Sequence, residues 1–120
     1  MGKNKTSILL TAAGCLAVPV LASACPDLGS YYPDTDEEWS SVERLLAPLF
    51  SQCSDSSEYF TLLGTAQLRR SDLLQALESF ELALLLDPEN GAALVDYAEV
   101  LFQQGQLLAA LEINQQLLSR

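Results

Sequence analysis

A set of small and aromatic residues recurs in the second half of this chain with a period of about 34 residues. In the first copy, which starts at Ser57, the set is Phe60, Leu63, Gly64, Ala76, Phe80, Ala83 and Pro88. In the second copy, which starts at Gly91, the positions equivalent to the first four hold Leu94, Tyr97, Ala98 and Ala110, and Leu101 lies at the position of Gln67. A fixed period of this length predicts a repeat architecture in which each unit packs on its neighbours.

This pattern resembles the tetratricopeptide repeat, a helix–turn–helix unit of about 34 residues. The resemblance covers Ser57 to about Leu118. It implies an all-α fold, a right-handed solenoid of about two repeats preceded by one helix, that works as a scaffold for protein binding. The chain departs from the family pattern at Gln67 and at Asn114, where the family has aromatic residues.

Apolar periodicity and turn residues predict five helices. Their ranges are 36–50, 57–70, 72–86, 90–104 and 106–119. Thr35 and Glu38 have the spacing of a capping box, and Pro48 is expected to kink or end the first helix. Asp87 and Pro88 are expected to start the fourth helix as N-cap and first-turn proline.

Three expectations about packing and turns follow from the types of individual residues. Gly64 and Ala76 are small enough for the two helices of the first repeat to touch backbone to backbone, with Phe80 facing the next repeat. Gly105 suits the tight turn before the last helix. The run Leu84–Leu86 is expected to be buried between helices.

The chain divides into three segments. Residues 1–24 have the basic start, apolar stretch and small-residue end of a secretory signal peptide. An uncleaved N-terminal anchor is the alternative. Residues 25–56 form a leader loop and the first helix, and residues 57–120 form the tandem repeats.

Two cysteines, Cys25 and Cys53, remain after residue 24. An even pair in an exported protein predicts a disulfide. A cysteine at the first mature position is also where bacterial lipoproteins carry their lipid, so Cys25 could instead anchor the chain in a membrane. The two chemistries compete because the lipid thioether would consume the Cys25 sulfur.

The mature chain is strongly acidic, because residues 25–120 contain all 16 acidic residues but only 4 of the 6 basic ones, which gives a charge of 4 − 16 = −12. This charge disfavours nucleic acid and anionic lipid surfaces as partners and suits a basic partner. The chain has no histidine and the mature part has no lysine, so the usual nucleophile–base pairs are absent. We therefore expect no catalytic activity, no cofactor and no metal site.

The resemblance implies a concave surface lined by the first helix of each repeat. In this chain the corresponding positions include Glu58, Thr61, Thr65, Leu68, Arg69, Val95, Glu99 and Phe102. Apolar side chains edged by carboxylates would suit a basic or amphipathic segment of another protein.

The last helix is also rich in leucine, on more than one face, which predicts an exposed apolar surface. Self-association through this helix, an external partner, or continuation into a longer protein would each cover it. The function expected from the whole sequence is that of an exported, non-catalytic adaptor in the periplasm or outside the cell. The alternatives are a lipid-anchored structural component or the N-terminal module of an outer-membrane assembly factor.

Overall fold

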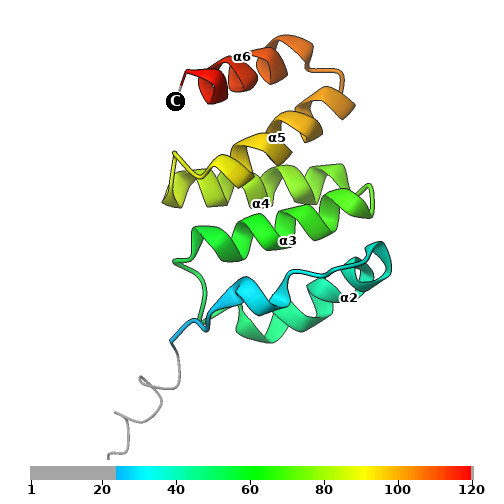
Figure 1. Cartoon of the computed structure of the whole chain (residues 1–120), viewed down its shortest axis with the longest axis vertical. Helices are drawn as coiled ribbons and strands as arrows, with labels where there is room; N and C mark the ends of the chain where they lie inside the picture. The colour runs from blue at the N-terminus through cyan, green and yellow to red at the C-terminus, as the bar shows by residue number, and fades with distance from the viewer. Residues whose placement is uncertain (1–23, 120) are drawn as a thin grey trace, which may run out of the picture.

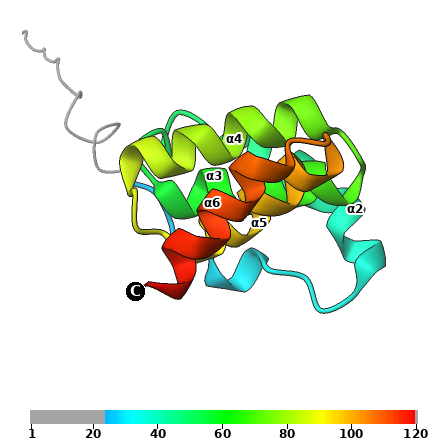
Figure 2. The same cartoon turned by 90° about the horizontal axis from the view of Figure 1, so that it is seen from above.

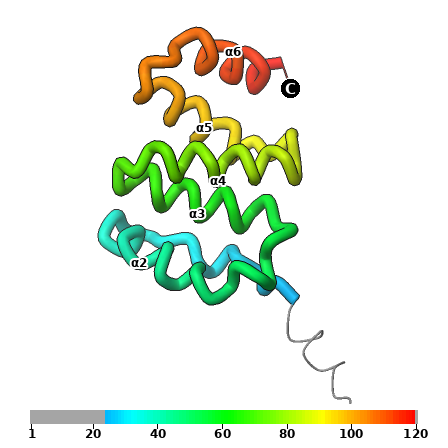
Figure 3. Tube along the Cα trace, turned by 180° about the vertical axis from the view of Figure 1, so that it is seen from behind, coloured from blue at the N-terminus to red at the C-terminus, as the bar shows by residue number. Residues whose placement is uncertain are grey.

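The computed structural model describes residues 24–119, which form five α-helices, two short 3-10 helices and no β-strand. The elements are η1 (Leu28–Tyr31), α2 (Asp36–Leu46), η2 (Ala47–Leu49), α3 (Ser57–Arg69), α4 (Leu73–Leu86), α5 (Gly91–Gln103) and α6 (Leu107–Leu118). The α-helices stack in chain order along the long axis of the molecule (Figure 1, Figure 3). The expected all-α array of helical hairpins is therefore confirmed, while the predicted signal peptide lies, except for Ala24, outside the described residues.

Helix boundaries agree with the sequence to within a residue or two, except at the first helix. There the α-helix ends at Leu46 and continues as η2, with Pro48 in its first turn. Proline has no backbone N–H to donate to the preceding turn, so the predicted interruption is confirmed. The leader, expected to be a loop, contains the short η1 helix, because Leu28 is buried and Asp27 caps the turn at the Gly29 N–H.

Thr35 is the N-cap residue of α2 as expected, but its capping-box hydrogen bonds are absent, and the expected Asp87 cap of α5 is wrong. The Thr35 side chain makes no capping bond, and the Glu38 carboxylate accepts from the Asp34 N–H at 3.0 Å rather than from Thr35. Helix α5 is capped by Asn90, whose side chain accepts from the Ala93 N–H at 3.1 Å. Asp87 instead closes a turn after α4 by accepting from the Glu89 N–H, so the helix begins three residues later than an Asp87 cap would place it.

The first repeat is organised around one glycine. A Cβ atom on Gly64 would lie 2.7 Å from Cε1 of Phe80, and the Phe80 side chain is fully buried. The space at Gly64 therefore holds the aromatic ring of the same hairpin. This corrects the expectation of backbone-to-backbone contact there and explains why position 64 has no side chain.

Gln67, the departure from the family pattern in the first copy, is buried and bridges three helices. Its Oε1 accepts from the Ser79 hydroxyl on α4 at 2.6 Å, and its amide nitrogen lies 3.5 Å from the Glu43 carboxylate on α2. Glu43 also pairs with Arg70 at 3.0 Å. The polar residue is accommodated because hydrogen-bonding partners surround it.

Helix α2 packs under α3 in the register of a second helix of a repeat. The positions one repeat length before Ala76, Phe80 and Ala83 hold Val42, Leu46 and Leu49. Val42 and Leu46 are fully buried, and Leu49 packs against the same core. The leader precedes α2 where a first helix would come in the sequence, and it runs on the side of the stack away from α4 (Figure 2). Leader and α2 together therefore take the place of a complete repeat.

The tight turns inside both repeats have the same left-handed backbone. Ser71 has φ 63°, and Gly105, at the equivalent position of the next repeat, has φ 81°. The predicted role of Gly105 is confirmed, and Ser71 occupies the equivalent turn with a residue that seldom adopts this conformation.

One burial expectation fails in α4. Leu84 packs against the core, but Leu85 is 78% exposed and Leu86 is also exposed. The hairpin buries only one stripe of α4, because no helix among the described residues covers its outer side (Figure 2).

Candidate partner-binding surface

The first helices of the two repeats, α3 and α5, line the face on which the groove was predicted. The leader loop covers part of this face, at the end near Glu58 and Asn90. Tyr32 lies beside α3 and α5, where burial, Glu58 and Asp96 together raise the pKa of its hydroxyl. Tyr32, Glu58 and Asn90 share a hollow of about 360 Å³. The leader is thus part of this surface, which the sequence did not indicate.

Thr61 must be removed from the predicted surface. Its side chain is only 3% exposed, donates to the Ser57 carbonyl at 2.9 Å and accepts from the Asn90 amide at 3.0 Å. Asn90 caps α5, the first helix of the next repeat, and its contact leaves little of the Thr61 side chain accessible to a partner. Thr65 is half-buried and donates to the Asp96 carboxylate at 2.6 Å, so it too links α3 to α5.

Leu68 and Arg69 are both used within the fold, Leu68 in the core and Arg69 in the contact with α2. Leu68 packs against the core, and the Arg69 guanidinium pairs with Asp36 at 2.7 Å. The guanidinium also lies 4.9 Å from the centre of the Trp39 ring. Of the predicted first-repeat residues, Glu58 is therefore the exposed one whose side chain is not bonded to α2 or α5.

The second repeat keeps its predicted surface open. Val95 is 55% exposed, Phe102 is 61% exposed and Glu99 is exposed between them. They line a hollow of about 250 Å³, which we call the α5–α6 hollow, defined by Val95, Ala98, Glu99, Phe102, Ala110 and Asn114. Asn114 is the repeat counterpart of Phe80, so the second copy has a short polar residue where the first has a buried ring.

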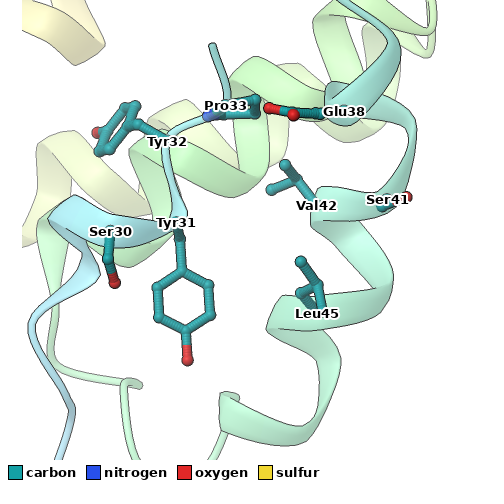
Figure 4. A pocket seen from close by; sticks show the side chains of 8 residues that line it. All are labelled: Ser30, Tyr31, Tyr32, Pro33, Glu38, Ser41, Val42 and Leu45. Carbon is teal, nitrogen blue, oxygen red and sulfur yellow. The ribbon is translucent and has the colours of Figure 1, made fainter. Parts of the chain in front are cut away.

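A further hollow of about 400 Å³ lies between the leader and α2. Figure 4 shows Tyr31 and Tyr32 projecting from the leader, with Val42 and Leu45 facing the same space from α2. The sequence missed this site because it is formed by two segments that only the fold brings together. The tyrosine pair before Pro33 was the available signal.

Cys25 and Cys53 form a disulfide, with their Cα atoms 4.8 Å apart. The predicted pairing is therefore present in the structure, and it joins the start of the leader to the connection between α2 and α3. The Cys25 sulfur is consumed by this bond.

Among residues 24–119 no group of three or more acidic, cysteine or histidine side chains is placed to hold a metal ion. The search for a membrane-spanning helix in the same residues found none of sufficient length and apolarity.

Comparison with known families agrees with this architecture. A family model described as the tetratricopeptide repeat matches residues 67–120, from the end of α3 through α6. Residues 67–120 belong to the tetratricopeptide repeat family. Tetratricopeptide repeats are protein–protein interaction modules whose stacked hairpins present extended binding surfaces. The comparison with curated proteins found no match.

Proposed function

We propose that this protein is an exported adaptor that binds another protein in the cell envelope and catalyses no reaction. The observation that carries the proposal is the pair of exposed apolar side chains, Val95 and Phe102, on either side of Glu99 in the α5–α6 hollow. Side chains of this size are usually buried, and an exposed group around a concavity is typical of an interaction site. Glu58 extends the same surface toward the leader.

The acidic surface supports a basic or amphipathic partner. Glu58 and Glu99 lie on this face of a chain whose residues 25–120 have a formal charge of 4 − 16 = −12. Such a field speeds the encounter with a positively charged segment and opposes binding to nucleic acid.

Export is supported by the signal-peptide pattern of residues 1–24 and by the disulfide, which persists in oxidising compartments. The alternative is a lipid-anchored component or the N-terminal module of an outer-membrane assembly factor. The mass of the intact mature protein distinguishes the adaptor from the lipid-anchored component. A chain that starts at Cys25 and is two hydrogens lighter than its reduced form supports the adaptor, whereas added acyl chains would establish the anchor.

Partner capture from envelope extracts tests the binding function. Phe102→Glu places a charge at the centre of the proposed surface, and Leu85→Glu places the same charge on the exposed outer side of α4. We expect the first variant to lose the captured protein and the second to retain it. Equal capture by both variants, or no protein retained by the parent chain, would contradict the proposal.

A further inference from the structure

The repeat symmetry places an exposed face on the second hairpin where the first hairpin has a covered one. Thr61, Phe80 and Ala83 of the first copy are buried, and their counterparts one repeat later are Val95, Asn114 and Leu117. Val95 and Asn114 are exposed. Three leucines on α4, Leu73, Leu77 and Leu84, pack against the core, while their counterparts on α6, Leu107, Leu111 and Leu118, are exposed. The second hairpin therefore exposes the face that is equivalent to the one covered by α5 on the first hairpin.

The first hairpin shows what an occupant of this face contacts. Asn90, at the start of α5, donates to the Ser57 hydroxyl at 2.8 Å and to the Thr61 hydroxyl at 3.0 Å. Further along α5, Asp96 accepts from the Thr65 hydroxyl at 2.6 Å. The polar side chains of α5 therefore match three hydroxyls on α3.

The second hairpin has different groups at the three equivalent positions. Ser57, Thr61 and Thr65 correspond to Gly91, Val95 and Glu99. Two hydroxyls are lost, which makes this end of the face more apolar. The third becomes a carboxylate, which accepts from Gln103 at 2.7 Å and is exposed. An occupant that covers this face removes solvent from the Glu99 carboxylate and must place a donor opposite it, and a basic side chain supplies the strongest one.

We infer that the exposed face of α5 and α6 binds an amphipathic helix of a partner protein, placed as α5 is placed on the first hairpin and carrying a basic residue opposite Glu99. This inference rests on the proposed binding function and specifies the partner's chemistry. A second copy of the chain fits less well, because residues 25–120 have 16 acidic and 4 basic residues and a symmetric pair would bring its Glu99 side chains to one interface. Like charges facing each other oppose association.

Two synthetic peptides test the inference. Both span residues 88–104, the segment that contains the natural occupant of the first hairpin, and one of them carries Asp96→Arg. In the shifted register residue 96 of the peptide lies opposite Glu99 of the protein. Binding to the oxidised mature chain is measured by fluorescence anisotropy at low and high salt.

We expect the Asp96→Arg peptide to bind about 10-fold more tightly than the unsubstituted peptide, because an arginine opposite Glu99 is attracted to it, whereas the aspartate is repelled. This difference in affinity should shrink at high salt. Glu99→Gln in the protein should remove most of the difference, and Phe102→Glu should abolish binding. Leu85→Glu, on α4, should change neither peptide's affinity. Equal binding of the two peptides, or no effect of Glu99→Gln, would overturn the inference.

Two further outcomes separate this inference from the function on which it rests. If envelope capture succeeds but is unaffected by Glu99→Lys, the adaptor stands and the basic helix is wrong. If sedimentation shows a dimer that Phe102→Glu dissociates, the occupant is a second copy and the inference is also overturned. Failure to capture any protein contradicts the adaptor function itself.

Discussion

Gly64 and Phe80 show how a single missing side chain positions a whole hairpin. The Phe80 ring occupies the volume where a Cβ on residue 64 would be, with three ring atoms at 2.7–2.9 Å from that Cβ. Because Phe80 is fully buried, the ring cannot move aside into solvent. The close approach of α3 to α4 therefore depends on glycine at this position.

Gly64→Ala is expected to lower the free energy of unfolding by about 1–3 kcal/mol through overpacking, and Gly64→Leu by at least as much. Chemical denaturation measures the change. Gly91→Ala is the matched control, because a Cβ there meets no atom within 4 Å. Adding Phe80→Leu should partly rescue Gly64→Ala. A Gly64→Ala protein as stable as the parent would show that Phe80 packs differently.

The two equivalent turns offer a second test at the residue scale. Ser71 has a positive φ at an exposed position, and Gly105 has the same conformation with open space around it. We expect Ser71→Gly to be neutral to stabilising by up to about 1 kcal/mol, because relief of strain outweighs or balances the added freedom of the unfolded chain. Gly105→Ser should destabilise by about 1 kcal/mol. Changes of the same sign in both variants would contradict this account of the turns.

At the scale of elements, the leader and α2 replace a repeat with less regular structure than a helical hairpin. The contacts that hold them in place include the Cys25–Cys53 disulfide, the ion pair of Arg69 with Asp36, and the Tyr59 hydroxyl, which donates to the Leu46 carbonyl at 2.8 Å. The disulfide acts at the two ends of this unit, so it should matter more than the surface ion pair.

Reduction of the disulfide tests this role. The bond closes a loop of 53 − 25 + 1 = 29 residues, for which the chain-entropy estimate is roughly 3–4 kcal/mol. We expect reducing agent to lower the melting temperature by several degrees. A variant with both cysteines changed to serine should melt at the reduced temperature and be insensitive to the reductant. Identical melting of the oxidised and reduced parent chain would show that the leader contributes little to the fold.

At the scale of the whole molecule, the titrating groups predict a one-sided pH dependence above neutrality. Burial raises the pKa values of Tyr59, Tyr32 and Tyr97, with added contributions from Glu58 and Asp96 at Tyr32 and from Glu81 at Tyr97. The described residues contain no histidine, which would titrate at about pH 6.5, and no lysine, which would titrate at about pH 10.4 together with the tyrosines.

Stability should therefore decline as the pH rises above about 10, where phenols of the unfolded chain lose their protons and those of the folded chain keep them. The folded state then binds more protons than the unfolded state, so the free energy of unfolding falls. Denaturation midpoints between about pH 7 and pH 11, with phenolate absorbance recorded alongside, measure this. Tyr32→Phe should reduce the alkaline loss, and a stability that rises in this range would contradict the assignment.

The sequence alone determined the repeat, its register and nearly all helix boundaries. These features depend on local properties: apolar spacing along one helix, proline and glycine at turns, and the fixed length of the repeat. Gly64 could therefore be recognised as a position that needs a small residue, and Gly105 as the tight turn, before the fold was known. The pairing of Cys25 with Cys53 was also indicated, because these are the two cysteines that follow the predicted signal peptide.

Only the tertiary structure decided which residues of the predicted surface remain accessible. Thr61 is buried because Asn90, 29 residues later, donates a hydrogen bond to it. The Arg69 guanidinium is paired because the fold places Asp36 and Trp39 of α2 beside it. Val95 and Phe102 stay exposed because no described helix stacks on them as α5 stacks on the first hairpin. Local pattern assigns a residue to a face of its own helix, whereas accessibility depends on contacts between segments distant in the chain, which form only when the hairpins pack.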